Sequence, residues 1–231
     1  MKKITLDRNC YFSEFLNTIL HTFNNLEAFE IEVEVVDLMN IDEFQESYPS
    51  VKSIVVNFLY SEFHYFGANV EEPFEIFKSF PELEELHFHN IDNAGSQAML
   101  VGCLSYPLTH LTKLRHLTLI SQLPGTYCPP SHFSLDLTQR LFEMQGTEEF
   151  KHLQQLETLR VDQLLLDRFL DMTIQMLRMS GVHVSVVYQT GVEKDDGIQS
   201  HELGPLFLDE SFDEENASLH EFSTKIFQKV T

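Results

Sequence analysis

The sequence predicts an α/β fold, a solenoid with about six short parallel strands on its concave face and helices outside. The first observation is an apolar spacing, apolar-x-x-apolar-x-apolar, that recurs with helix-like segments in between. The second is that its copies begin roughly 23 to 42 residues apart, a period typical of stacked strand-and-helix units. The copies are Leu26-Phe29-Ile31, Val51-Ile54-Val56, Leu83-Leu86-Phe88, Leu114-Leu117-Leu119, Leu156-Leu159-Val161 and Met179-Val182-Val184.

A helix is expected before the first of these strands. Phe12, Phe15, Leu16, Ile19 and Phe23 recur at helical spacing and form one broad aromatic face. We expect this helix to cap the first strand, because an uncovered end of a repeat stack would expose its apolar core to water.

Helices are also predicted between successive strands, where apolar residues follow the helical period. Pro73 suits a first helical turn, and Pro107 is expected to end a helix because the residue before a proline avoids helical geometry. Gly146 and Gly181 stand where helix C-termini favour glycine. The expected helices are 41–48, 73–80, 95–106, 135–145 and 164–179.

The composition changes after Tyr188. Residues 193–215 contain nine acidic residues and one lysine, which is typical of a flexible acidic segment. Ser218-Leu-His-Glu221 matches a capping box, and the apolar residues that follow predict an amphipathic helix. The sequence therefore divides into a repeat domain with its helical cap at 1–190, an acidic segment at 191–217 and a C-terminal helix at 218–231.

The charge of the chain restricts its partners. The net charge is −21, from 36 acidic and 15 basic residues, so phosphate backbones and anionic membranes would be repelled. A basic protein partner is compatible with this charge, as is the simpler interpretation that it keeps the protein soluble. With 231 residues, 43% of them hydrophobic, the chain is long enough to bury one continuous core.

The cysteines favour a reducing compartment, the cytoplasm or the nucleus. Cys10, Cys103 and Cys128 are odd in number and show no paired spacing, so they predict neither a disulfide framework nor a zinc ribbon. The stretch after Met1 is interrupted at Asp7 and lacks the apolar core of a signal peptide. No run of the sequence approaches the roughly 18 apolar residues that a membrane span needs.

Two of the copies read Phe80-Pro-Glu-Leu-Glu-Glu-Leu-His-Phe-His89 and Leu111-Thr-Lys-Leu-Arg-His-Leu-Thr-Leu119. They resemble the leucine-rich repeat, whose strand core is L-x-x-L-x-L, and the resemblance covers roughly residues 20–190. The unequal periods are similar to the irregular, helix-backed repeats of ubiquitin-ligase substrate receptors. No F-box is identified, since the N-terminal helix lacks its Leu-Pro start and is too short. The family's usual Asn or Cys, three residues after the last strand apolar, is replaced by Glu34, Leu59, Ile91, Gln122, Leu164 and Val187.

The resemblance implies that the residues between the strand apolars line the concave face, since side chains alternate across a strand. His87, His89 and His116 should cluster there beside Arg160, and His183 should lie level with Arg160. This cluster has three interpretations. It fits a binding face, which needs only to present such groups rigidly. The alternatives are a metal site formed by the histidines and a solvated strand face without a function. The candidate binding residues are Glu85, His87, His89, His116, Thr118, Arg160, Asp162 and His183.

The sequence shows no established catalytic motif. Cys128 and His132 are four residues apart, but the sequence gives no third group to orient them. A Gly-rich phosphate loop, Gly-x-Ser-x-Gly and His-Glu-x-x-His are absent from the sequence. We therefore expect no enzyme, no cofactor and no metal.

These features favour a protein–protein interaction module that is non-catalytic and monomeric by itself. The resemblance implies that it works as an adaptor or substrate-recognition subunit. A first alternative is an acidic binder or chaperone of basic proteins such as histones, because an acidic segment follows the repeats. A second alternative is a metalloprotein or hydrolase that uses the concave-face histidines.

Overall fold

The computed structural model describes most of the first 194 residues and divides the chain into two units, Met1–Asp195 and Asp196–Thr231. Every described residue lies in the first unit. The predicted C-terminal helix, and the predicted acidic segment apart from residues 193–194, lie outside the described residues. These are 3–6, 18–34, 38, 47–59, 71–91, 97–121, 132–144, 153, 155–162, 168–187 and 193–194.

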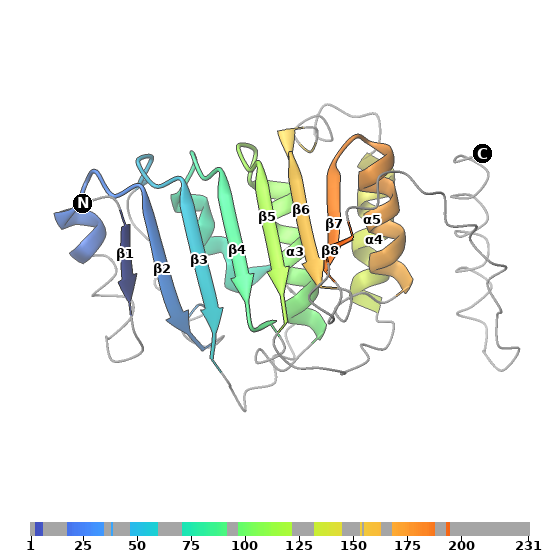
Figure 1. Cartoon of the computed structure of the whole chain (residues 1–231), viewed down its shortest axis with the longest axis horizontal. Coiled ribbons are helices and arrows are strands. Elements are labelled where there is room, and N and C mark those ends of the chain that lie inside the picture. Colours follow the sequence, from blue (N-terminus) through green and yellow to red (C-terminus); the bar gives the residue numbers. More distant parts are fainter. Residues whose placement is uncertain are drawn as a thin grey trace, which may run out of the picture. The chain divides into compact units, whose positions relative to one another are not determined.

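The described strands form a single open sheet in strict chain order (Figure 1). Its first seven strands are parallel, so the prediction of an α/β chain is confirmed. The last strand pairs antiparallel with the seventh and lies in residues that were assigned to the acidic segment. The strands are β1 (Lys3–Leu6), β2 (Ala28–Val33), β3 (Ser53–Phe58), β4 (Glu85–His89), β5 (His116–Ile120), β6 (Thr158–Asp162), β7 (His183–Val187) and β8 (Glu193–Lys194).

The recurring apolar spacing fixes the register of this sheet. Ile54 pairs with Leu86, Leu86 with Leu117 and Leu117 with Leu159, so that the same position of each copy meets its counterpart in the next strand. Burial alternates along β2 to β5, as expected for strands with one face against a core.

A turn precedes each of these strands and explains the first apolar position of each copy. The backbone N–H of Leu83 donates to the Phe80 carbonyl, and that of Leu114 donates to the Leu111 carbonyl. The same three-residue turn links Phe23 to Leu26, Tyr48 to Val51 and Leu153 to Leu156. Each of these turns therefore lies between two apolar residues, all of which are buried except Phe23, which is 37% exposed.

The first strand was missed by the prediction of about six. Ile4 and Leu6 of β1 pair with Phe29 and Ile31, and Met1, Ile4 and Leu6 carry the same apolar spacing as the other copies. The helical residues 18–22 therefore lie between β1 and β2 in the chain, not ahead of the first strand. Residues 12–17 of the predicted cap helix are outside the described residues.

The last copy was placed two residues too early. Leu159 pairs with Val184 and Val161 with Val186, so the seventh strand uses Gly181-Val184-Val186, and Met179 is 60% exposed. Gly181 has a φ of 92° directly after the preceding helix, and glycine adopts this left-handed geometry without strain. The prediction of a helix end at Gly181 is confirmed.

Helices cover the face of the sheet that carries the buried strand side chains (Figure 1). Phe88 of β4 packs edge-on against Phe74 and Phe77, with ring centroids 5.7 and 5.9 Å away, and stacks on Phe58 of β3. Hydrophobic burial of such rings is the main stabilising contribution to the core. The helices are η1 (Glu72–Ser79), α3 (Gln97–His110), α4 (His132–Met144) and α5 (Arg168–Met179).

Two helices differ from expectation. The segment predicted at 73–80 is a 3₁₀ helix, in which residues three apart eclipse one another, and this matches the three-residue spacing of Phe74, Phe77 and Phe80. The helix predicted to end before Pro107 continues to His110. Pro107 lies in its last turn, where Leu111 still donates to the proline carbonyl and only one helical hydrogen bond is lost.

Among the residues that the structure describes, no helix is both long and apolar enough to cross a bilayer. Residues 41–46 of the helix predicted at 41–48 lie outside the described residues, and Ser47 and Tyr48, which are described, are not helical.

Candidate functional site

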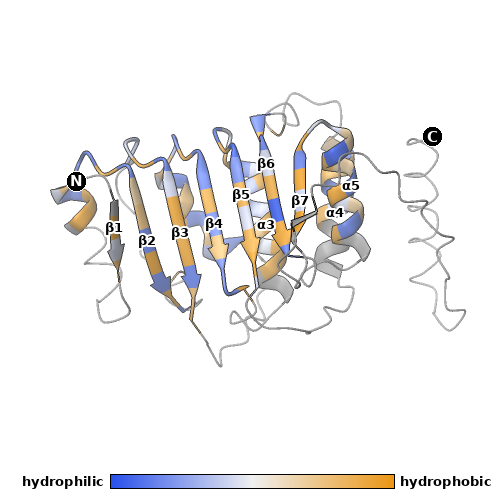
Figure 2. Ribbon diagram, viewed as in Figure 1, coloured by the Kyte–Doolittle hydropathy of each residue, from blue (hydrophilic) through white to orange (hydrophobic). Residues whose placement is uncertain are grey.

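The open face is the side of strands β2 to β7 whose side chains point away from the helices. Figure 2 shows hydrophilic and hydrophobic residues alternating along β4 and β6, and the hydrophilic ones belong to this face. Strand register arranges them in rows across the sheet. The central row is Glu30, Val55, His87, Thr118 and Arg160, and the first row is Ser53, Glu85, His116, Thr158 and His183.

His116 in the first row contacts two residues at the start of the next strand, β6. Its Nδ1 atom lies 2.8 Å from the hydroxyl of Thr158, and its Nε2 atom lies 3.8 Å from a carboxylate oxygen of Glu157. Thr158 is the residue paired with His116 in β6, so the register of the two strands creates this contact.

His87 and His89 project from the same side of β4, with ring centroids 6.5 Å apart. Burial lowers the pKa of His87 below its ordinary value of 6.5, although Glu85, whose Oε2 lies 3.9 Å from His87 Nε2, acts in the opposite direction. Burial also lowers the pKa of His89; Glu30 raises it and Arg160 lowers it further. Both imidazoles are therefore neutral at pH 7.

A hydrogen-bonded chain crosses three strands beside these histidines. The Nδ2 group of Asn57 donates to Glu30 Oε1 at 2.9 Å, and Asn57 Oδ1 lies 3.1 Å from His89 Nδ1. Asn57 and Glu30 were not among the predicted site residues. Their position beside His89 followed from the alignment of the copies, but the bonds depend on side-chain reach across strands.

The remaining predicted residues are distributed over this face as follows. Thr118 is half-buried in the central row and Arg160 is exposed at its end. Asp162 follows Arg160 by two residues but is only 6% exposed, so it offers little surface to a partner. His183 is exposed and pairs with Thr158; Ser185, not His183, lies level with Arg160, because the last copy is shifted by two residues.

The edge ladder is a line of alternating charges at the start of four successive strands: Lys52, Glu84, Arg115 and Glu157. Lys52 Nζ donates to Glu84, Arg115 Nη1 lies 3.8 Å from Glu84 Oε2, and Arg115 Nε donates to Glu157 at 2.8 Å. The backbone repeats the pattern, since each residue's N–H donates to the carbonyl of the one before. Hydrogen bonding to Lys52 lowers the pKa of Glu84, and the same contact raises that of Lys52.

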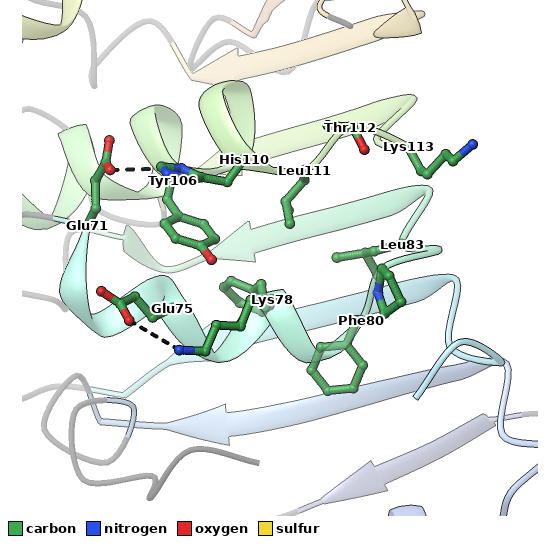
Figure 3. A pocket seen from close by; sticks show the side chains of 12 residues that line it. Glu71, Glu75, Lys78, Phe80, Leu83, Tyr106, His110, Leu111, Thr112 and Lys113 are labelled. Carbon is green, nitrogen blue, oxygen red and sulfur yellow. Dashed lines mark hydrogen bonds and ion pairs between the residues drawn. The ribbon is translucent and has the colours of Figure 1, made fainter. Parts of the chain in front are cut away.

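A groove of about 430 Å³ lies on the helical side, between η1 and the end of α3 (Figure 3). Tyr106 points from α3 toward η1, where Glu75 and Lys78 form an ion pair. The Tyr106 ring stacks on His110 at a centroid distance of 4.6 Å. Burial, assisted by Glu75, raises the pKa of Tyr106 to about 12, so its hydroxyl stays protonated and can donate a hydrogen bond.

Glu71 connects three helical elements at one end of this groove. One of its oxygens accepts from Ser105 of α3 and, at 2.8 Å, from Arg140 of α4; the other lies 3.8 Å from His110 Nδ1. No sequence motif marks this arrangement, because its members are distant in the chain and meet only through helix packing. Because the Glu71 carboxylate already contacts three side chains, we interpret this end of the groove as a structural contact between helices.

The described residues contain no group of three or more His, Cys, Asp or Glu side chains that could hold a metal ion. Cys128 lies outside the described residues, as does the side chain of His132, while Cys103 is buried and its thiol pKa is raised by that burial. No family model, curated protein or solved structure matches the chain.

Proposed function

We propose that the chain is a leucine-rich-repeat-like solenoid and a non-catalytic protein interaction module that binds its partner on the open face. Adaptor or substrate-recognition work is the role that such a module would serve. The observation that carries the proposal is the central row, in which five strands in succession present one side chain each at the same level.

Rigid presentation supports this function. The residue just before the central-row residue on each strand points to the opposite side. Leu86, Leu117 and Leu159 at this position are fully buried against the helices. Their packing fixes the strand, and the strand fixes the direction of the polar side chains on the other side. A surface held in this way loses little conformational entropy when a partner binds.

The chemistry of the face also suits protein recognition. It combines an acid, a cation, imidazoles that donate and accept, and the aliphatic side chain of Val55. Hydrogen bonds and charge complementarity from such a mixture confer specificity on an interface whose centre excludes water.

The edge ladder supports the repeat interpretation. In place of a side-chain asparagine ladder, the backbone carbonyls of Lys52, Glu84 and Arg115 each accept N–H groups from the next copy, at 2.7 to 3.0 Å. Successive copies are thereby tied together at the same point, which is what a stack of like units requires.

The test is capture of partners from a cell extract by the immobilised chain. Thr118→Arg places a long cation at the centre of the central row, and Gln139→Arg places the same side chain on the exposed surface of α4 as a matched control. We expect proteins captured by the native chain and by Gln139→Arg to be lost with Thr118→Arg, while circular dichroism shows all three folded. Equal capture by all three would contradict a binding role for the open face.

A further inference from the structure

The central row carries opposite charges at its two ends. Glu30 stands on β2 and Arg160 on β6, and three residues without formal charge at neutral pH lie between them: Val55, His87 and Thr118. From this arrangement we infer that the open face binds an extended peptide segment of its partner, with a basic and an acidic side chain about six residues apart. The inference rests on the proposed function and specifies the partner's chemistry.

The distance between the charges sets the spacing in the partner. Neighbouring strands are about 4.8 Å apart, so four steps from β2 to β6 separate the Cα atoms of Glu30 and Arg160 by about 19 Å. An extended chain advances about 3.3 Å per residue, and it covers this distance in about six residues. A helix would need about thirteen residues at 1.5 Å each, and a helix of that length would present many more side chains than one row receives.

The surroundings strengthen the negative sign at the β2 end. Glu32 lies two residues beyond Glu30 on the same side of β2, and the Glu30 carboxylate is oriented by the amide of Asn57 at 2.9 Å. At the other end Arg160 is exposed, whereas Asp162, two residues along the same strand, is only 6% exposed and offers little surface to a partner. A basic side chain of the partner is therefore attracted to β2 and an acidic one to β6.

The middle of the row suits the backbone and small side chains of an extended segment. Val55 offers a half-buried aliphatic contact, Thr118 a hydroxyl and a methyl group, and His87 both a donor and an acceptor. Along its own length, β4 presents only Glu85, His87 and His89 on the open face, and none of these is a cation that could oppose the acid. The central row separates an acid from a cation in the direction that crosses the strands.

The experiment is selection from a displayed library of random twelve-residue peptides. The native chain, Glu30→Gln and Arg160→Gln serve as targets; Gln at position 30 can still accept from Asn57, so the substitution removes charge and keeps the hydrogen bond. Glu143→Gln on α4 and Lys113→Gln in the turn before β5 are the matched controls, both at exposed positions away from the open face.

We expect peptides from the native chain and both controls to share a basic and an acidic residue five to seven positions apart. Glu30→Gln should lose the preference for the basic residue alone, and Arg160→Gln the preference for the acidic residue alone. A selected peptide should bind each variant about two- to fivefold more weakly at low salt, the change that an exposed ion pair gives.

Other outcomes separate this inference from the proposed function. Peptides that are lost with Thr118→Arg but show no paired charges, or the same sequences from all five targets, would overturn the inference and leave the open face as a binding surface. Peptides that bind Thr118→Arg as well as the native chain would overturn both.

Discussion

The Nδ1 atom of His89 lies 3.1 Å from the Oδ1 atom of Asn57. Because the Asn57 amide nitrogen donates to Glu30, its oxygen is left to accept, and the proton of neutral His89 must therefore reside on Nδ1. The Nε2 atom of His89 then carries the lone pair. A cross-strand hydrogen bond thus decides the tautomer of a histidine on the candidate binding face.

Asn57→Asp should raise the pKa of His89. A carboxylate at position 57 would stabilise the imidazolium, and it would also face the Glu30 carboxylate at close range, lowering stability above about pH 5. Histidine side-chain NMR titration measures the first effect and urea unfolding at pH 5 and 7 the second. His87, whose main charged neighbour is Glu85, serves as the internal control; an unchanged His89 pKa would contradict the contact.

Acidification should destabilise the protein through His87 and His89. Burial lowers both pKa values below the ordinary 6.5, so the unfolded chain binds protons more readily than the folded one. Their contribution to stability is complete above about pH 6.5 and is lost as the pH falls from there toward the lowered pKa values. The double variant His87→Gln/His89→Gln should show a shallower fall in its urea midpoint between pH 7 and 5. Parallel curves for the two proteins would exclude this contribution.

Leu117→Ala should lower the free energy of unfolding by about 2–5 kcal/mol, because the side chain is fully buried and its removal leaves a cavity. Its neighbour Thr118 points to the open face, so Thr118→Ala should change stability by no more than about 0.5 kcal/mol. Chemical denaturation of both variants measures the contrast. Similar losses of stability in the two variants would contradict the assignment of Leu117 to the core side of β5 and of Thr118 to the open face.

Glu71→Ala should lower stability by about 1–3 kcal/mol, since Ser105 is buried and would lose its acceptor while Arg140 would lose its carboxylate. Glu75 lines the same groove but forms an exposed ion pair with Lys78, so Glu75→Ala should lower the free energy of unfolding by less than about 1 kcal/mol. Thermal unfolding of the two variants compares them. Equal effects would show that Glu71 does not join the helices.

The strands were predictable because the same backbone pairing repeats: Leu86, Leu117 and Leu159 occupy one position of one motif. The errors arose where the motif has no unique alignment. Val182, Val184 and Val186 alternate, so the apolar spacing fits at two registers, and only the turn at Gly181 decides between them. The strand β1 was also missed, although Met1, Ile4 and Leu6 fit the spacing in full and the sequence alone could have revealed it.

His87, His89 and His116 could be placed from register alone, whereas His183 was misplaced by the two-residue shift of the last copy. The chemistry of these histidines could not be predicted. Whether an imidazole is neutral depends on how deeply its neighbours bury it, and burial does not follow from strand position alone. Asp162, for example, lies at an outward position and is nevertheless buried. The contacts of Glu71 and Asn57 join residues that are distant in the sequence, and their side chains meet only in the folded structure. Sequence spacing carries no information on such contacts.

The alternation of the edge ladder distinguishes neighbouring strands in a way that their apolar residues do not. Removal of the strand that carries Glu84 would set Lys52 beside Arg115, and duplication of any one of these strands would place two like charges side by side, which opposes pairing. Removal or insertion of two adjacent strands with their connections would preserve the sequence of signs. An engineered change of length is therefore expected to leave the edge ladder intact only in steps of two strands.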